Sequence, residues 1–292
     1  DADWIARVDR SAAARLTPGL FRLRLAVEQV LNSRFAMHVA HIITRLILGG
    51  AQQNTLLTCE GQHRDQGDEV TLITGPGLGP EGSLMDRARA AGFRVIEIDA
   101  MRRSIHPWRD WTSYREVIRV LRDLQPDIVH THSSKAGIIG RAAAARVRIP
   151  VVHTIHGASF HRGQHPVAFH AYQMLERHAA RWTDAFISVC VSLTNQYVAA
   201  GIAPVDRFTT IYSGMDVEPF LNPPRPRTEV RTELGLASEH VAFAKVARLF
   251  HLKGHKYLIP AAKRVIERCP HARFVLIGDG ELRSEFESQI AS

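Results

Sequence analysis

The chain has 292 residues, of which 45% are hydrophobic and 7% aromatic, which suffices for one complete domain and part of a second and excludes a disordered chain. Its formal net charge of +8 favours anionic partners such as nucleotides or phospholipid headgroups, but the basic residues are scattered as on an ordinary solvated surface, and no nucleic-acid partner is expected. Three cysteines lie far apart, at Cys59, Cys190 and Cys269, which argues against disulfides and a thiolate zinc cluster and favours a reducing compartment.

Residues 1–36 precede an alternating apolar run that begins at Met37, and they are expected to form a partly helical N-terminal extension. The basic amphipathic stretch 20–31 could lie on a membrane surface. An ordinary surface helix or an upstream remnant explains the same pattern.

From Met37 onward, short β-rich runs alternate with segments of helical period, which is typical of a parallel sheet covered on both faces. The predicted strands are residues 37–44, 69–74, 94–98, 127–131, 151–155, 185–189 and 208–212. A helix is predicted over 108–124, ending before Gln125 and Pro126, and another is predicted to begin with Ser192 as its N-cap and to stop at Gly201. Residues 37–215 are therefore expected to form a Rossmann-like first domain.

Four prolines between residues 218 and 227 predict an extended linker, which we place at 216–240. The alternating pattern then restarts, with strands expected at 241–246 and 273–277, a helix over 254–268 and a further helix from Glu281. Two strands cannot close a doubly wound sheet. Residues 241–292 are thus expected to be the start of an incomplete second domain, and the fold class is α/β with two Rossmann-like doubly wound domains.

Gly49-Gly50-Ala51-Gln52 follows the first predicted strand and opens a helix. Paired glycines let the backbone approach a ligand closely, and the free amides at a helix N-terminus favour phosphate or another anion. A simple tight turn is the alternative. The glycine- and proline-rich segment 75–80 resembles a dinucleotide fingerprint only superficially, because no helix follows it at once, so we expect a mobile loop.

Histidines gather at the ends of two predicted strands: His130 and His132, then His153, His156, His161 and His165. The carboxyl ends of parallel strands line the ligand crevice of such sheets. His130 and His132 would share one face and could bind a metal, as in metal-dependent hydrolases, but Asp127 is the only carboxylate nearby. His156, followed by Gly157, is better placed to contact a sugar or a leaving group. Taken singly, His130, His153 and His165 are also explained as structural histidines.

A third candidate site is the segment from Arg248 to Gly254, between a strand and a helix of the second domain. Two cations, Arg248 and Lys253, beside a helix N-terminus would suit a diphosphate. The segment Gly278-Asp279-Gly280 follows the next strand and supplies a second loop at the same edge. The two loops together are more informative than either alone.

In the order and spacing of these segments, the sequence from Met37 onward resembles the glycosyltransferase family 4 enzymes. The similarity is carried by residues 49–52, 127–132, 153–157, 211–216, 246–248 with Lys253 and Gly254, and 278–280. It implies the two-domain GT-B fold and a retaining transferase that moves a sugar from a UDP-, GDP- or ADP-sugar to an acceptor without a metal or other cofactor. It also implies that the first domain binds the acceptor and the second the donor.

The resemblance assigns roles to individual residues. Gly49, Gly50, Gly278, Asp279 and Gly280 are expected at the donor phosphates, together with Arg248 and Lys253, which neutralise the leaving diphosphate. His156 is expected at the reacting sugar, so His156, Arg248 and Lys253 form the catalytic set. Gln52, His132 and Gly157 are expected to contact the acceptor or the sugar. No residue is expected to bind a metal ion.

The family pattern continues with a pair of glutamates in a glycine-rich segment, and the sequence stops before it, so this chain itself is expected to be incomplete and could be inactive. Pro260 also falls early in a predicted helix, where proline is tolerated only in the first turn. Two alternatives remain open, a non-catalytic nucleotide- or acceptor-binding fragment and a metal-dependent hydrolase. No run of about twenty apolar residues occurs, so a cytoplasmic location is expected, with peripheral binding at the inner membrane face and a saccharide or lipid-linked acceptor.

Overall fold

The computed structural model describes residues 36–79, 81–161 and 163–291. The expected N-terminal extension, apart from residue 36, lies outside them. The chain divides into two compact units between Met215 and Asp216. Among the described residues, no helix combines the length and the apolar composition that a bilayer crossing demands.

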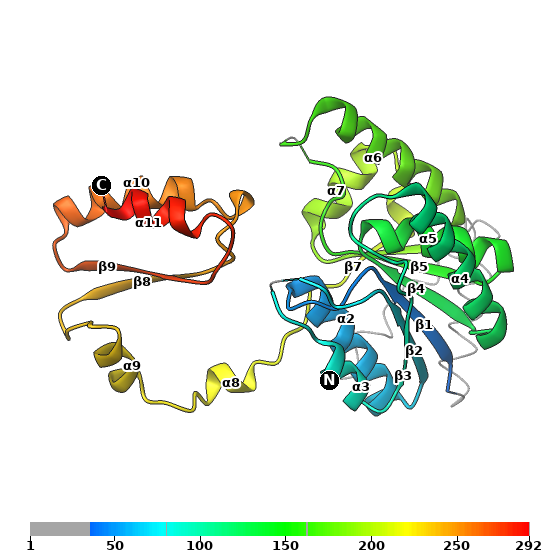
Figure 1. The fold of residues 1–292 in the computed structure, drawn as a ribbon, viewed down its shortest axis with the longest axis horizontal. Helices are drawn as coiled ribbons and strands as arrows, with labels where there is room; N and C mark the ends of the chain where they lie inside the picture. The colour runs from blue at the N-terminus through cyan, green and yellow to red at the C-terminus, as the bar shows by residue number, and fades with distance from the viewer. Residues whose placement is uncertain (1–35, 80, 162, 292) are drawn as a thin grey trace, which may run out of the picture. The chain divides into compact units, whose positions relative to one another are not determined.

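A seven-stranded parallel sheet forms the centre of the first unit, in the order β3-β2-β1-β4-β5-β6-β7 (Figure 1). The strands are β1 (His38–Ile43), β2 (Glu69–Thr74), β3 (Arg94–Glu97), β4 (Ile128–His132), β5 (Val151–Ile155), β6 (Ala185–Ser188) and β7 (Phe208–Thr210). The order reverses between β1 and β4, because the chain first adds strands outward from β1 and later outward from β4. In open sheets of this kind, ligands bind at such a reversal point.

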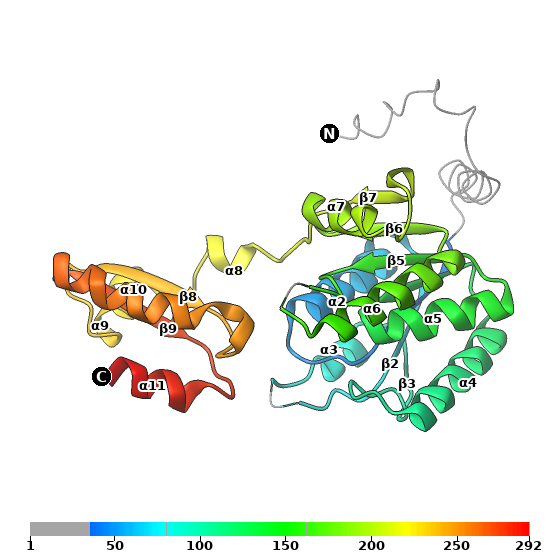
Figure 2. The same cartoon turned by 90° about the horizontal axis from the view of Figure 1, so that it is seen from above.

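The α-helices that connect these strands are α2 (Gly50–Gly61), α3 (Met85–Ala90), α4 (Pro107–Leu124), α5 (Ser134–Val147), α6 (Pro166–Ala179) and α7 (Val191–Ala199). A π-helix, η3 (Gln62–Gln66), extends α2. Helices α4 and α5 lie side by side along the sheet (Figure 2). The doubly wound arrangement predicted from the alternating pattern is confirmed for this unit.

Apolar side chains fill both faces of the sheet. Ala40, Ile42 and Val129 pack with residues of α4 and α5 in one cluster. Ile43, Val70 and Leu72, whose side chains point to the opposite face of the sheet, pack with residues of α2 and α3. Because successive strand residues face opposite sides, these two clusters fix which face each histidine of β1 and β4 can occupy.

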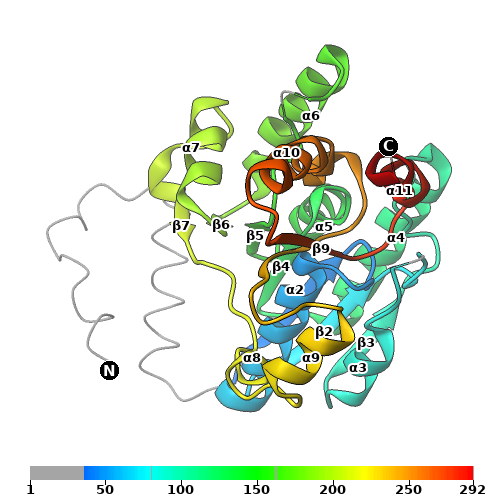
Figure 3. The ribbon, with the colours of Figure 1, turned by 90° about the vertical axis from the view of Figure 1, so that its left-hand side faces the viewer.

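The second unit contains the two-stranded parallel sheet of β8 (Val241–Val246) and β9 (Ala272–Ile277). Helix α10 (His255–Arg268) lies over this pair of strands, and α11 (Arg283–Ala291) contacts α10 (Figures 1 and 3). Proline is best tolerated in the first turn of a helix. Pro260 lies beyond the first turn, inside α10. The expected strand, helix, strand and helix are all present.

Two sequence expectations about local structure were wrong. Cys190, in an extended conformation, precedes the first residue of α7, so Ser192 lies within the helix instead of capping it. The predicted linker contains two short helices, α8 (Glu218–Leu221) and α9 (Arg227–Glu233). Pro219 is tolerated because the first turn of a helix needs no amide proton at that position.

The three cysteines are free, as their spacing predicted, with Cys59 buried and Cys269 exposed. The segment 75–79 is a loop, as expected, but its start is tightly packed. A Cβ atom on Gly75 would lie 1.8 Å from the carbonyl oxygen of Met101. Glycine is therefore required there by the neighbouring backbone, which explains the residue without a nucleotide.

Candidate active site

The reversal point of the sheet lies next to the amino end of α2. Gly49 is the N-cap residue, and no side chain caps the helix or adds a negative charge in its first turn. A Cβ atom on Gly50 would meet nothing within 4 Å. A helix N-terminus with open space and unopposed positive dipole is suited to an anion. Gln52 follows in the first turn, with its Oε1 close to Gly49.

On the other side of the reversal point, Ser133 joins β4 to α5 with φ 61° and ψ 160°. This backbone region is normally restricted to glycine and costs about 1–3 kcal/mol. The Ser133 hydroxyl lies 2.7 Å from the hydroxyl of Thr44 at the end of β1, and Thr44 Oγ1 accepts a hydrogen bond from the amide of Ala136. These contacts tie the two strand ends together at the place where the crevice is expected.

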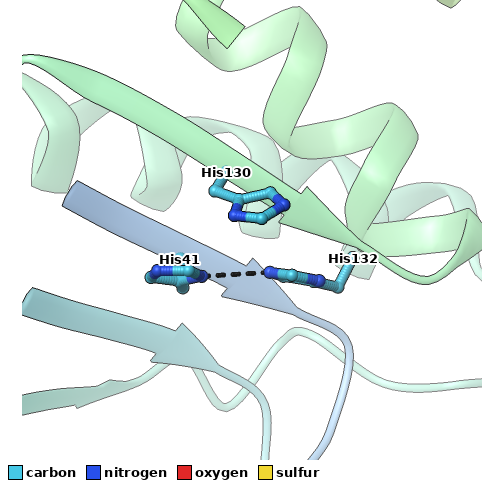
Figure 4. A group of neighbouring side chains, drawn as sticks. All are labelled: His41, His130 and His132. Carbon is cyan, nitrogen blue, oxygen red and sulfur yellow. Dashed lines mark hydrogen bonds between the residues drawn. The ribbon is translucent and has the colours of Figure 1, made fainter. Parts of the chain in front are cut away.

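Three histidines from the two central strands lie together on one face of the sheet. His41 of β1 pairs in register with His130 of β4, and the His130 and His132 ring centroids are 4.2 Å apart. Figure 4 shows His41 directed toward His132, with 3.0 Å between His41 Nδ1 and His132 Nε2. The shared face of His130 and His132, predicted from their spacing, is confirmed.

The histidine contacts continue in both directions from this pair. His41 Nε2 is 2.6 Å from the side-chain oxygen of Gln62, the first residue of η3. His132 Nδ1 is 3.1 Å from Nε2 of His156, just past β5. His41 and His132 are fully buried, whereas His156 is partly exposed. A continuous line of hydrogen bonds therefore runs from Gln62, along one face of the sheet, to His156.

Burial keeps these imidazoles neutral. It lowers the pKa of His41 to about 4, against the opposing effect of the hydrogen bond to Gln62. Burial also lowers the pKa of His156 to about 4. For His132, burial and the neighbouring histidines place the pKa well below its ordinary value. Each ring therefore has one protonated and one unprotonated nitrogen at neutral pH.

The same three histidines could be considered for a metal, since ligand nitrogens of His41, His130 and His132 lie within 4.8 Å of one another. His41 and His132, however, each use both ring nitrogens in hydrogen bonds. His130 Nε2 is 2.7 Å from the hydroxyl of Thr154. A bound ion would have to displace these bonds, so the arrangement favours a hydrogen-bonded network over a metal centre.

The remaining candidates of the histidine-rich segments lie elsewhere. His153 occupies the other face of the sheet, where its Nδ1 is 2.9 Å from the Thr131 hydroxyl. His161 accepts a hydrogen bond from the amide of Gly163 in its own loop, and His165, the N-cap residue of α6, accepts one from the amide of Val167. Asp127 accepts from the amide of His38 at the amino ends of the strands, away from the cluster. Among the described residues, His156 is the histidine of this segment that extends the network, and the contacts of His153 and His165 fit the structural role that each could have when taken singly.

A buried ion pair supports the loop that carries His156 and Gly157. Arg141 of α5 donates to Glu176 of α6 at 2.8 Å. Ser159 Oγ lies 3.2 Å from the second Glu176 oxygen and 3.3 Å from the hydroxyl of Tyr197. Burial, together with the charge of Glu176, raises the pKa of Tyr197 to about 12. Ser159 is two residues from Gly157, so the network fixes the path of this loop.

In the second unit the structure brings the two predicted loops into contact. The amide of Leu249 donates to the carbonyl of Asp279 at 2.9 Å, and that of Leu282 donates to the carbonyl of Leu249. A Cβ atom on Gly278 would lie 2.1 Å from the carbonyl oxygen of Ala247, and one on Gly280 2.4 Å from that of Leu249. Both glycines are therefore needed for close approach of backbone to backbone.

The two cations flank this contact. The Arg248 guanidinium lies 5.3 Å from the ring centroid of Phe250, and Lys253 is exposed immediately before Gly254, the N-cap residue of α10, whose φ is 72°. The structure therefore places Arg248, Lys253 and the segment 278–280 at one edge of β8 and β9, as their positions after the two strands predicted.

Sequence reasoning did not identify His41, Gln62, Arg141 or Glu176. His41 carried a usable signal, because a histidine inside an otherwise apolar run is unusual for a buried strand. Gln62 and the ion pair carried none, since their partners are remote in sequence and are chosen by the packing of helices on the sheet.

Comparison with known proteins identifies the family to which the chain belongs. The sequence profile described as glycosyl transferase 4-like domain matches residues 49–214. A relative in Escherichia coli, UDP-Gal:alpha-D-GlcNAc-diphosphoundecaprenol alpha-1,3-galactosyltransferase, is 32% identical over 255 residues, which cover 85% of this chain and 64% of the relative. Alpha-monoglucosyldiacylglycerol synthase of Acholeplasma laidlawii is 28% identical, over 61% of this chain and 48% of its own length. The chain thus spans about half to two thirds of these relatives.

Solved structures agree with the fold. Anabaena Alr3699/HepE in complex with UDP and glucose superposes with a TM-score of 0.67 at 19% identity, covering 87% of this chain and 66% of that one. UDP-GlcNAc 2-epimerase from Neisseria meningitidis, bound to UDP-GlcNAc, gives 0.56 at 13% identity, covering 87% and 68%. These likenesses support the shared architecture alone, which transferases and epimerases both use.

Proposed function

The chain belongs to the family of glycosyl transferase 4-like domains, and from that membership we propose that the protein transfers a sugar from a nucleotide diphosphate sugar to an acceptor. The observation that carries the proposal is the family match over residues 49–214. That stretch contains the amino end of α2 and the His156–Gly157 turn, both beside the reversal point of the sheet. An uncapped helix end and a neutral histidine at the carboxyl edge of the same sheet suit an anionic leaving group and a sugar.

The donor is proposed to be a UDP-hexose, with GDP- and ADP-sugars as the alternatives to test, and the acceptor a lipid-linked saccharide. The Escherichia coli relative is named for UDP-Gal and an acceptor linked to diphosphoundecaprenol, and the Acholeplasma relative for a glucosyldiacylglycerol. Both names describe sugars joined to lipids. A saccharide intermediate of polysaccharide synthesis has the same chemistry at its hydroxyl group.

The reaction builds positive charge on the sugar and negative charge on the departing diphosphate. Fixed cations and helix dipoles lower such a barrier because they need no reorganisation when the charge develops. In the second unit we assign this task to Arg248 and Lys253. For the first unit, taken by itself, we propose that the amides at Gly49 and Gly50 bind a phosphate of the donor. Gly278, Asp279 and Gly280 complete the donor-phosphate loop, and Gln52, His132 and Gly157 belong to the acceptor or sugar side, His132 acting through His156.

Retention of the anomeric configuration is part of the proposal. The acceptor hydroxyl attacks the face from which the diphosphate departs, and its proton passes to the leaving phosphate oxygen, so no protein base is needed. No metal is needed either, since Arg248 and Lys253 supply positive charge at the leaving group.

We also propose that the first unit binds peripherally to a membrane. Ile105, Trp108 and Trp111 are exposed by 75%, 72% and 53% at the beginning of α4, with Arg103 and Arg109 exposed among them. Tryptophan and arginine together suit the headgroup region of an anionic bilayer. Co-sedimentation with phosphatidylglycerol vesicles should fall at least severalfold in a Trp108→Ser/Trp111→Ser variant, whereas Val205→Ser, an exposed apolar residue elsewhere, should bind as the parent does.

The transferase proposal is tested by incubating the protein, with its natural continuation if it has one, with UDP-, GDP- and ADP-hexoses and lipid-linked saccharides. Release of nucleotide diphosphate that depends on the acceptor supports it, and the anomeric configuration of the product is read by nuclear magnetic resonance (NMR). Failure of every donor and acceptor counts against it. Binding of a nucleotide sugar without turnover would support the binding-fragment alternative. Bound zinc by elemental analysis, with activity lost on chelation, would support the hydrolase.

A further inference from the structure

In the line of hydrogen bonds from Gln62 to His156, every donor lies on the same side of its acceptor. This direction is set at the Gln62 end, which we call the inner end; His156 is the outer end. The Gln62 side-chain oxygen is 2.6 Å from His41 Nε2. A carbonyl oxygen can only accept a hydrogen bond, so Nε2 of His41 carries the proton. The π-helix η3, which begins at Gln62, presents this side chain to the sheet. Such local widenings of a helix often occur at functional sites.

Each following ring is then fixed by the ring before it. Neutral His41, protonated on Nε2, has only a lone pair on Nδ1, so at 3.0 Å it accepts from Nε2–H of His132. His132 in turn has a lone pair on Nδ1, which at 3.1 Å accepts from Nε2–H of His156. Complete burial of His41 and His132 keeps both neutral and leaves no solvent to exchange partners.

Neighbouring groups do not disturb this order. His130, whose ring is 4.9 Å from that of His41 and 4.2 Å from that of His132, directs its Nε2 to the Thr154 hydroxyl. Among the described residues, no carboxylate is hydrogen-bonded to His41, His130, His132 or His156. A carboxylate would stabilise a cation in the line and remove the direction.

We infer that Gln62, His41 and His132 form a directional relay that holds His156 as its neutral, Nε2-protonated tautomer, with the Nδ1 lone pair offered at the carboxyl edge of the sheet. His156 then accepts a hydrogen bond from a substrate hydroxyl and adds no positive charge. This matters for the proposed glycosyl transfer, on which the functional part of the inference rests, because a cation there would oppose the positive charge that develops on the sugar. Gln62, His41 and His132 are positioning residues.

The relay predicts a spectroscopic signature. In protein labelled with 15N in its histidines, two-bond 1H–15N correlation spectra distinguish protonated from unprotonated ring nitrogens. His156, assigned by loss of its signals in His156→Asn, should show an unprotonated Nδ1 and a protonated Nε2 near neutral pH. A protonated Nδ1 on His156 in the parent protein would overturn the inference.

A substitution of Gln62 should change the tautomer of His156. In Gln62→Glu a carboxylate stabilises protonated His41, whose Nδ1–H would then donate to His132 and reverse the line, so that Nδ1 of His156 becomes protonated. Gln66→Glu makes the same chemical change at an exposed position of the same π-helix and should leave the spectrum unaltered. Gln62→Leu, which removes the acceptor without adding charge, should produce a mixture of tautomers on His156.

The kinetic consequence is a fall in kcat/KM of about tenfold in Gln62→Glu, as for loss of one good hydrogen bond, with Gln66→Glu within about twofold of the parent. A His156 spectrum unchanged in both Gln62 variants would refute the relay even if the enzyme were active. Conversely, the inferred tautomers in a protein that turns over no nucleotide sugar would uphold the relay and reject the transferase.

Discussion

Arg141 donates to Glu176 across 2.8 Å, with their side chains only 0% and 1% exposed to solvent. The Ser159 hydroxyl and the Tyr197 hydroxyl complete the group around the carboxylate. Removing one member of such a pair leaves the other charge buried without compensation. The stability lost when one partner is removed is larger than the net stabilisation that the intact pair provides.

Arg141→Met should therefore lower the free energy of unfolding by about 3–5 kcal/mol. In the double variant Arg141→Met/Glu176→Gln, which contains neither charge, the loss should be smaller than in Arg141→Met alone. Urea unfolding followed by tryptophan fluorescence measures both. The control is Arg89→Met, which breaks a solvent-exposed pair with Glu97 and should cost less than about 1 kcal/mol. Equal losses in the single and double variants would contradict this account.

Removal of either proposed diphosphate ligand should damage catalysis more than folding. In an active form of the protein, Arg248→Ala or Lys253→Ala should reduce kcat by about a hundredfold or more, as for loss of one preorganised transition-state contact. Arg268→Ala removes the same charge at the far end of α10 and should leave kcat within about twofold. Initial rates of nucleotide diphosphate release test the assignment, and unaltered rates in the first two variants would disprove it.

Gly278 should not tolerate a side chain. Its φ is 147°, and an added Cβ atom would lie only 2.1 Å from the Ala247 carbonyl oxygen, so Gly278→Ala forces the two loops apart. We expect amide hydrogen exchange over residues 241–291 to accelerate by tenfold or more, equivalent to about 1.4 kcal/mol. Gly235→Ala is the matched control, because Gly235 also has positive φ but open space around its Cβ position. It should accelerate exchange less than Gly278→Ala.

Acid should destabilise the first unit through its buried histidines. The unfolded chain protonates His41 near its ordinary pKa of 6.5, whereas in the folded protein burial lowers that pKa to about 4. Above pH 6.5 the ring is neutral in both states and costs nothing. As the pH falls from 6.5 to 4 the unfolded state binds the extra proton, and stability decreases by up to about 3 kcal/mol from this residue. His130, His132, His153 and His156 lie around the same sheet and act in the same direction, and the nearby charge of Arg141 adds to the effect on His153.

The measurement is the free energy of unfolding from urea titrations between pH 7.5 and 4.5. His41→Gln should show a shallower fall over this range than the parent protein, even if it is less stable at pH 7.5, because it has lost one of the groups that titrate. Parallel curves for the two proteins would mean that His41 is not held neutral.

The sequence predicted the sheet well because its strands are short apolar runs with clear ends. The bounds of β2, β5 and β8 match those expected from residues 69–74, 151–155 and 241–246. The predicted N-cap at Ser192 was wrong because capping preference is a local property of the residue. The start of α7 depends on where the chain leaves β6, which makes Cys190 the N-cap residue. The prolines wrongly predicted an extended linker because Pro219 lies in the first turn of α8, a position that favours proline.

The site was only half predictable for a different reason. Alternation alone places His130 and His132 on one face, and His156 follows the next strand. The partnership of His132 with His41 depends on β1 lying beside β4, and strand order is decided by how helices cover the whole sheet. The contact of Gln62 with His41 depends in addition on the π-helix after α2. The residue types of this segment do not predict a π-helix.

The position of β1 between β2 and β4 has a consequence for how the chain comes off the ribosome. His41 and His132 are 91 residues apart, so at about 5–20 residues per second several seconds of translation separate them. During that interval β1 can pair with β2, but its other edge has no partner and is open to wrong association. The histidine line can therefore assemble only after β4 and the residues up to His156 have been translated, and until then the edge of β1 that faces β4 lacks its native partner.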